Sequence, residues 1–212
     1  MSEEVFISPR KHGRIAVLIS GRGSNFTRIH DAVRDGRIDA EIGLVFSNRE
    51  GAAGLEIARE RGLETIFLNP RLYPEKEDYD REILREIRKR GIDLVCLAGY
   101  MKVLCPMFCR EYRNRAMNIH PALLPAFPGL NVQRGAIDWG VRVSGCTVHF
   151  VAPEVDRGPI ILQAAVPVLP DDTEETLAAR ILVEEHKIYP EAVRLYFEGR
   201  LEVRGRRVRI RD

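Results

Sequence analysis

Short apolar runs that end at a glycine, each followed by an amphipathic segment, constrain the fold of this chain most strongly. The first run covers residues 14–20, and the glycine-rich turn at 21–25 leads from it into helical spacing over residues 26–33. Continuous apolar runs of this length are typical of parallel strands that helices cover on both faces. The pattern therefore predicts a strand, a glycine loop and a helix near the start of the chain.

The same alternation continues to about residue 120. Further strands are predicted at residues 40–46, 65–68, 92–98 and 117–119, and helices at residues 52–61 and 75–90. Strands and helices that alternate in this way form parallel crossover units. We therefore expect an open, mostly parallel, twisted α/β sheet with helices on both faces, as in Rossmann-like folds.

After residue 120 the pattern changes. A short helix at 132–139 precedes strands at 144–151 and 159–168 with no helix between them, which predicts an antiparallel hairpin. Asp172 with Glu175 three residues later is a capping pattern for a long helix that runs to about residue 197. The second part of the sheet is therefore expected to be antiparallel.

A chain of 212 residues can form one sizeable core, so we predict a single domain. This domain spans residues 14–201. A loose tail is expected at residues 1–13, and a basic hairpin or tail at residues 202–212.

Composition and charge indicate small-molecule partners. Lysine and arginine total 33 against 31 acidic residues, and a net charge of +2 provides no strong field for nucleic acid. No apolar run is long enough to cross a bilayer, and the first residues lack a secretory signal, which predicts a cytoplasmic protein without a membrane partner. Cysteines without a CxxC pair predict reduced thiols and no metal site; they are Cys96, Cys105, Cys109 and Cys146.

Asn118 and His120 lie at the end of a predicted strand, two residues apart, and so point from the same face of the sheet. Three prolines and a glycine within residues 121–129 then turn the chain away from the sheet. Ligands of open α/β sheets bind beyond the carboxyl ends of the strands, where this pair is expected. A hydrogen-bonded histidine with a purely structural role is the alternative.

The glycine loop at residues 21–25 offers free backbone N–H groups and the positive end of a helix dipole, which suit a phosphate group. A dinucleotide fingerprint is disfavoured, because Phe26 takes its last glycine position and Ser47 and Asn48 end the next strand without an acidic residue. A Walker loop is disfavoured because no Gly-Lys-Ser/Thr follows. A tight turn without a ligand is the simpler alternative.

Two acidic residues complete the candidate site. Asp156 lies in the loop of the predicted hairpin, where turn formation is its simplest role. Glu185 shares helical spacing with Ile181 and Ile188, so we expect it at an apolar face with a cationic partner. An imidazole, an amide and a carboxylate at one cleft can transfer protons and stabilise an oxyanion, and no obvious nucleophile stands beside the histidine. Direct acyl transfer to an amine is therefore favoured.

Seven motifs in fixed order allow a more specific interpretation. They are ISGRGSN at 19–25, VFSN at 45–48, LAGYM at 97–101, NIHPALLP at 118–125, VHFV at 148–151, DRGPIILQ at 156–163 and EHKIYP at 185–190. With this set the chain resembles the phosphoribosylglycinamide formyltransferase family from about residue 14 to residue 201. Asn-Ile-His-Pro and Asp-x-Gly-Pro alone would indicate only the wider group of enzymes that use formyltetrahydrofolate.

The resemblance implies transfer of a formyl group from the co-substrate 10-formyltetrahydrofolate to the amine of 5'-phosphoribosylglycinamide, a step of purine biosynthesis that releases tetrahydrofolate. In this family His120 is expected to act as the catalytic acid. Asn118 is expected to bind the formyl oxygen at the folate site. Asp156 is expected to keep the histidine charged and to order a water for proton transfer.

The resemblance also implies two binding regions. Gly23, Ser24 and Asn25 are expected to hold the substrate phosphate, and Glu185 is expected to meet the glycinamide end. The folate-binding residues are expected to be Lys76, Met101, Lys102, Val103 and Leu104, together with Asn118. The family usually has arginine at positions 76 and 102, and lysine lacks the planar fork that grips a carboxylate through two hydrogen bonds.

Three alternatives are weighed against this interpretation. A formyltetrahydrofolate hydrolase, in which water replaces the amine, usually carries an N-terminal regulatory domain that the residues before Arg14 do not provide. Methionyl-tRNA formyltransferase needs a further C-terminal domain. A silent folate or nucleotide binding module is disfavoured by the joint presence of Asn118, His120 and Asp156. The oligomeric state is left open between monomer and homodimer.

Overall fold

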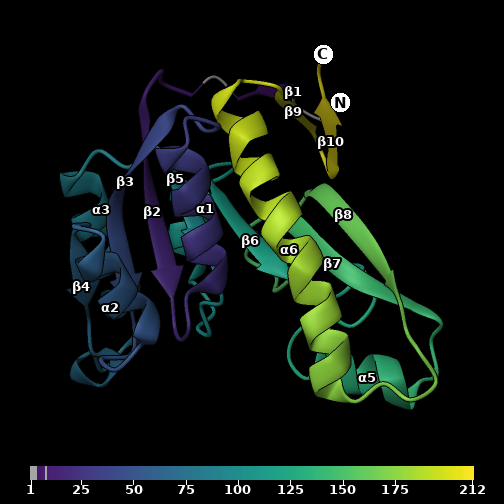
Figure 1. Ribbon diagram of the computed structural model, residues 1–212. Helices are drawn as coiled ribbons and strands as arrows, with labels where there is room; N and C mark the ends of the chain where they lie inside the picture. The colour runs from purple at the N-terminus through teal and green to yellow at the C-terminus, as the bar shows by residue number, and fades with distance from the viewer. Residues whose placement is uncertain (1–3, 8) are drawn as a thin grey trace.

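Strands and helices alternate along the chain, which a computed structural model describes at residues 4–7 and 9–212 (Figure 1). Within these residues the strands are β1 (Glu4–Phe6), β2 (Gly13–Ile19), β3 (Ala40–Ser47), β4 (Thr65–Phe67), β5 (Leu94–Leu97), β6 (Ala116–His120), β7 (Val143–Phe150), β8 (Ile160–Pro167), β9 (Leu201–Arg204) and β10 (Arg207–Ile210). The helices are α1 (Ser24–Arg34), α2 (Ala53–Glu60), α3 (Lys76–Lys89), α4 (Pro106–Glu111), α5 (Val132–Asp138) and α6 (Glu174–Phe197), with a short 3₁₀ turn at Pro70–Leu72.

All of these strands join one sheet, in the order β1-β9-β10-β8-β7-β6-β5-β2-β3-β4. Strands β2 to β6 pair in parallel, whereas β6, β7 and β8 pair antiparallel. The structure therefore confirms the predicted mostly parallel sheet with an antiparallel hairpin in its second part. The antiparallel pairing of β7 with β8 follows from their connection, because only a short loop without a helix joins them.

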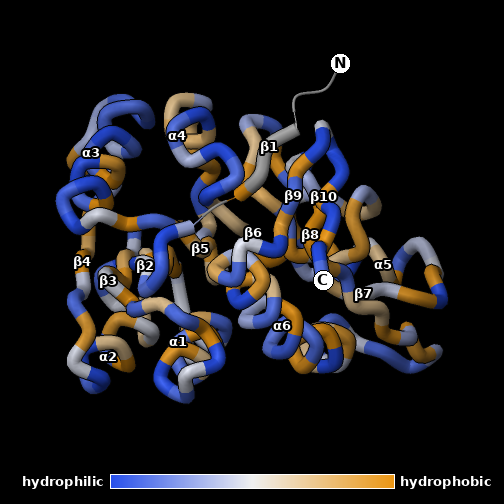
Figure 2. The backbone as a smooth tube through the Cα atoms, turned by 90° about the horizontal axis from the view of Figure 1, so that it is seen from above, coloured by the Kyte–Doolittle hydropathy of each residue, from blue (hydrophilic) through white to orange (hydrophobic). Residues whose placement is uncertain are grey.

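Side chains of β2 alternate between two cores. Because both faces of this strand are buried, its sequence is a continuous apolar run. Ile15, Val17 and Ile19 belong to the core under α1, α2 and α6, whereas Ala16 and Leu18 belong to the core under α3 and α4. Viewed from above, these helix groups lie on opposite sides of the sheet (Figure 2). Helices thus cover both faces of the parallel part.

The strand order creates a crevice at the carboxyl ends of β2 and β5. The chain passes from β2 to β3 and β4 on one side, and then returns to place β5 on the other side of β2. The loops after β2 and β5 therefore leave the sheet in different directions at their carboxyl ends. Ligand sites of open α/β sheets form at such switch points.

Two sequence predictions need correction. Within the segment predicted as a loose tail, Glu4–Phe6 form β1 and pair antiparallel with β9, and the Ile7 amide donates to the Leu201 carbonyl at 3.3 Å. The cap of α6 is Thr173 with Thr176, which exchange hydrogen bonds in a capping box. Asp172 precedes this cap, and its carboxylate accepts from Arg180 and from the Thr176 hydroxyl.

The last strands also belong to the sheet. Strands β9 and β10 form an antiparallel hairpin through Gly205, and β10 contacts β8 in parallel at Arg207 and Ile160. None of the helices in the described part of the chain combines the length and the apolar character that a membrane span requires.

Candidate active site

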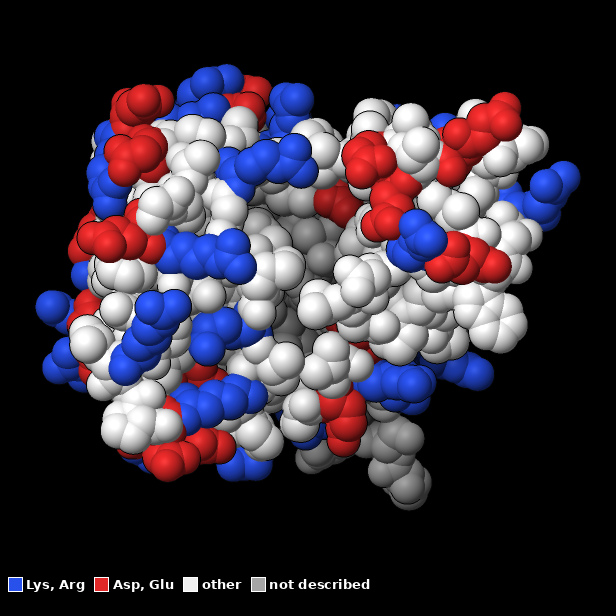
Figure 3. Space-filling model, turned by 90° about the horizontal axis from the view of Figure 1, so that it is seen from below, with Lys and Arg blue, Asp and Glu red and all other residues white. Residues whose placement is uncertain are grey.

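A cavity of about 440 Å³ opens at the carboxyl ends of β5 and β6. Asn118 and His120, two residues apart on β6, both line it, as the sequence predicted from strand periodicity. His120 is only 4% exposed, so its ring is shielded from bulk water. The face onto which these strand ends point is hollowed near its middle (Figure 3).

The ring of His120 is held between two acceptors. Its Nε2 donates to the Phe127 carbonyl at 2.8 Å, since a carbonyl can only accept. Its Nδ1 lies 3.3 Å from Asp156 Oδ2. A protonated imidazolium satisfies both acceptors, because each nitrogen then carries a proton.

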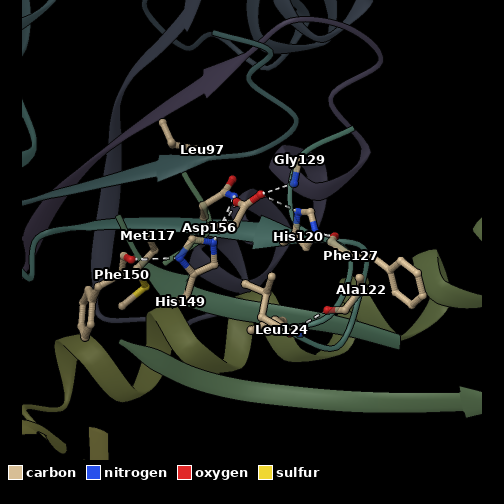
Figure 4. Close-up of polar contacts among 12 residues, drawn as sticks. Leu97, Met117, His120, Ala122, Leu124, Phe127, Gly129, His149, Phe150 and Asp156 are labelled. Atoms are coloured by element: carbon tan, nitrogen blue, oxygen red, sulfur yellow. Dashed lines mark hydrogen bonds and ion pairs between the residues drawn. The ribbon is translucent and has the colours of Figure 1, made fainter. Parts of the chain in front are cut away.

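Asp156 lies between two imidazoles, as Figure 4 shows, because His149 Nε2 approaches its second oxygen at 3.5 Å. The Gly129 amide donates to Asp156 Oδ2 at 2.9 Å. Burial alone would raise the pKa of Asp156, but hydrogen bonds from His149 and Gly129 and the charge of His120 outweigh it and hold the pKa below its usual value. The carboxylate is therefore ionised at neutral pH.

His149 was not predicted as a site residue. It lies on β7, opposite Asn118 across the antiparallel pair, and its Nδ1 donates to the Phe150 carbonyl at 2.9 Å. Its Nε2 lies 3.3 Å from Asn118 Nδ2 and 3.5 Å from Asp156 Oδ1. The alternation of β7 places His149 on the same face as Asn118, and only the pairing register reveals this.

The turn after β6 is held by a buried hydroxyl. Thr147 Oγ1 donates to the Ala122 carbonyl at 2.7 Å and accepts from the Leu124 amide at 3.1 Å. Gln163 Nε2 donates to the same hydroxyl at 3.0 Å and to the Leu124 carbonyl at 2.9 Å. These bonds fix the path of the chain to Phe127, whose carbonyl orients His120.

The predicted phosphate loop is also close-packed. Gly23 has φ +75° and a Cβ there would lie 2.8 Å from the Gly54 Cα, so only glycine lets this loop approach the start of α2. Ser24 begins α1, and Asn25 Nδ2 donates to Glu185 Oε2 at 2.7 Å. The structure thus brings Glu185 of α6 to the N-terminus of α1.

Glu185 has a different partner from the one expected. In the described part of the chain its carboxylate pairs with the Asn25 amide and not with a cation. Burial raises the pKa of Glu185, although the hydrogen bond from Asn25 lowers it in part. Asn25 Oδ1 is buried without a hydrogen-bond partner. A ligand that donates hydrogen bonds would satisfy both groups.

Hydrogen bonds connect the glycine loop after β2 with the strands that carry the cavity. The Ser20 amide donates to the Gly99 carbonyl at 3.1 Å, and Ser20 Oγ accepts from the Met101 amide at 2.8 Å. The Tyr189 hydroxyl, one turn after Glu185, lies 3.1 Å from the carbonyls of both Leu97 and Met117. The Ser20 bonds join the loops after β2 and β5, and the Tyr189 bonds join α6 to β5 and β6.

The predicted folate residues fall into two groups. The cavity is lined by Met101, Lys102, Val103 and Leu104. Lys76 is not among the lining residues; it is exposed at the start of α3. Lys102 Nζ lies 5.5 Å from the centre of the Tyr79 ring, close enough for a cation–π contact.

In the described part of the chain, no three His, Cys, Asp or Glu side chains gather as a metal site would require.

Comparison with known proteins decides the family. A model of the formyl transferase family matches residues 13–193. The chain belongs to this family. A solved structure of glycinamide ribonucleotide transformylase 1 from Symbiobacterium toebii has 53% sequence identity and a TM-score of 0.93, over 96% of this chain and 96% of that one.

Curated relatives agree with the resemblance seen in the sequence. Phosphoribosylglycinamide formyltransferase of Escherichia coli K12 is 45% identical over 189 residues, which are 89% of each chain. A trifunctional purine biosynthetic protein of Drosophila pseudoobscura is 47% identical, and the alignment covers 94% of this chain but only 15% of that relative. The predicted family is therefore confirmed.

Proposed function

We propose that this formyl transferase moves the formyl group of 10-formyltetrahydrofolate to the amine of 5'-phosphoribosylglycinamide. Tetrahydrofolate and the N-formyl product leave. The observation that carries the proposal is the cluster of Asn118, His120 and Asp156 in the cavity after β6. Near-full-length relatives with this activity support the choice of substrates.

The chemistry needs an oxyanion site and a route for one proton. The amine nitrogen attacks the formyl carbon, and its electron pair displaces the carbonyl pair onto oxygen. Asn118 Nδ2 is positioned to donate to that oxygen, and the positive charge of a protonated His120 stabilises the negative charge that develops there. Asp156 keeps His120 charged and accepts the ammonium proton through a water. The oxyanion then re-forms the carbonyl, the bond between the formyl carbon and N10 of the folate breaks, and N10 takes up that proton.

Binding is assigned to the regions on either side of this cluster. We assign the substrate phosphate to Gly23, Ser24 and Asn25, whose backbone opens α1. Glu185 is assigned to the amine-bearing glycinamide end, because a cation would pair with its buried carboxylate. The folate is assigned to the cavity with Met101, Lys102, Val103 and Leu104.

Lys76 is assigned to the outer end of the folate. It lies outside the cavity lining, but it shares with Lys102 an electrostatic interaction with the buried Asp80. Two ammonium groups near one carboxylate leave positive charge for the folate carboxylates. Lysine makes fewer oriented hydrogen bonds than arginine there, so we expect a lower affinity for the folate carboxylates.

The deciding experiment mixes the protein with both substrates and follows tetrahydrofolate release, with and without the amine. Release that requires the amine, and that His120→Ala and Asp156→Asn abolish, would establish the transferase. Release without the amine would instead indicate a hydrolase. Saturable binding of both ligands without turnover would indicate a silent binding module.

The proposal also covers the location of the protein in the cell, its partners and its oligomeric state. Four free, buried thiols suit a reducing compartment, and the cytoplasm is proposed on that basis. Small molecules are the proposed partners, without nucleic acid or membrane. Monomer and homodimer stay alternatives that sedimentation would separate.

A further inference from the structure

A second cavity, of about 350 Å³, lies apart from His120 and is not used by the proposed reaction. Four arginines from three separate parts of the chain line it, which are Arg110, Arg113, Arg157 and Arg206. Arg110 lies in the last turn of α4 and Arg113 just after the helix, Arg157 lies in the loop at residues 151–159, and Arg206 lies in the β9–β10 turn. We call this the arginine cavity.

The arginine cavity has an excess of positive charge. Glu154 is the one carboxylate among its lining residues in the described chain. Within that part of the chain, none of the four guanidinium groups forms an ion pair or a side-chain hydrogen bond with another residue. Since guanidinium groups around one cavity repel one another, an anion between them would lower the free energy.

A buried amide also faces the arginine cavity without a protein partner. Asn114 lines the cavity and is only 8% exposed, yet its side chain hydrogen-bonds to no residue that the structure describes. Its φ is +56°, so the backbone holds it in the left-handed region that asparagine tolerates. The polar atoms of this amide are open to solvent in the cavity, so Nδ2 is free to donate to an oxygen of a ligand there.

We propose that the arginine cavity is a second binding site, which takes a small polyphosphate group, either free or attached to a nucleoside. Guanidinium groups match phosphate oxygens through paired hydrogen bonds, and four of them suit a di- or triphosphate better than a single carboxylate. The volume lies at the lower end of the range for small-molecule sites. Apolar walls at Val151, Pro153 and Val203 leave room for a nucleoside.

Occupancy of the arginine cavity acts on the loop that carries Asp156. Val151 and Ala152 line both cavities. Glu154 and Arg157 line the arginine cavity, whereas Asp156 between them lines the other. A phosphate bound to Arg157 therefore restrains the residue next to Asp156, whose own φ is +53°. This inference does not depend on the formyl transfer reaction.

The test measures binding of tripolyphosphate, ATP and adenosine to the whole chain by calorimetry. We expect saturable binding of tripolyphosphate and ATP, but not of adenosine, and weaker binding at high salt. The variant Arg113→Gln/Arg206→Gln should weaken the binding of tripolyphosphate and ATP about 100-fold, because each hydrogen-bonded charge contributes about a factor of ten to the affinity. Tighter binding of ATP than of tripolyphosphate would identify a nucleotide as the source of the phosphates.

A matched control separates this site from the phosphate loop after β2. Arg207→Gln/Arg209→Gln removes two arginines of the same hairpin that do not line the arginine cavity, and should leave the affinity unchanged. No saturable binding, or equal affinity in the Arg113/Arg206 variant and the control, would overturn the proposal. Binding should also slow amide exchange at residues 154–157; unchanged exchange with tripolyphosphate bound would overturn the coupling to Asp156.

Discussion

At the scale of single residues, Asp156 connects most of the candidate site. It contacts both His120 and His149 and accepts from the Gly129 amide, so one carboxylate orients two rings and one loop. Its positive φ shows that the backbone of the loop is held in a rare conformation. The sequence placed Asp156 in a loop, but the loop's path back to β6 depends on contacts across the sheet.

Replacing Asp156 by asparagine should reduce kcat about 10²- to 10³-fold, because the imidazolium of His120 loses its counter-charge and the proton loses its acceptor. Binding of the substrates should change far less. Steady-state kinetics at neutral pH measures both. A kcat within twofold of the wild type would contradict the assigned role.

The same variant also predicts a pH dependence of stability. The folded pKa of Asp156 lies below its unfolded value, so its stabilising effect is complete above about pH 4 and is lost as the pH falls through the folded pKa. The difference in unfolding free energy between wild type and Asp156→Asn should therefore shrink below about pH 4. Asp171→Asn, at an exposed position, is the control and should show no such change.

Glu185 leads to the opposite prediction. Its folded pKa lies above the unfolded value, so the folded chain holds the proton more tightly and stability falls as the pH rises between the two. Glu185→Gln should raise the unfolding free energy at pH values above both pKa values, and should raise the KM for the amine substrate about tenfold. Urea denaturation and kinetics test this trade-off; a less stable variant at high pH would refute it.

At the scale of elements, the loop after β2 shows what the sequence could and could not specify. Glycine spacing predicted the turn and the start of α1. The contact between Gly23 and Gly54 was not predictable, because it depends on where the loop after β3 passes. In the same way, α6 begins one residue later than predicted, with Thr173 as its cap, while the Asp172 carboxylate binds Arg180 and Thr176; the spacing of the sequence does not separate these two candidates.

Gly23→Ala should destabilise the protein more than Gly36→Ala does. Both residues have a positive φ, near +75° and +73°, so each substitution costs about 1 kcal/mol in backbone strain. Only at Gly23 does the new Cβ meet backbone, which adds about 1–3 kcal/mol. Urea denaturation compares the two variants, and equal losses would show that the loops can move apart.

At the scale of the whole molecule, the site lies where two kinds of sheet meet. The parallel strands β2 to β6 carry the glycine loop at residues 21–25 and Asn118, whereas the antiparallel strands β7 and β8 deliver His149 and the loop with Asp156. Helix α6 contacts β7, β8 and α1, so it joins the two parts and brings Glu185 to Asn25. Apolar runs and glycines were sufficient to predict the parallel half, since their pattern is local.

Pairings between distant residues were the part that the sequence did not reveal. Strand β1 is only three residues long and lies about 200 positions from β9, so neither periodicity nor a turn signal links them. His149 escaped prediction for the same reason, because its contact with Asn118 depends on the register of β6 with β7. Such pairings follow from how the whole sheet assembles.

The pairing of β1 with β9 gives a prediction for the whole chain. A variant that lacks residues 1–7 loses this strand and the buried side chain of Ile7, which is 8% exposed. We expect the free energy of unfolding to fall by about 2 kcal/mol, the typical contribution of one buried isoleucine. The freed edge of β9 should also promote self-association, because an unpaired strand edge can pair with another copy. A variant that lacks only residues 1–3 is the control, and denaturation with sedimentation compares the two. If both variants are equally stable and equally free of self-association, β1 does not contribute to the fold in solution.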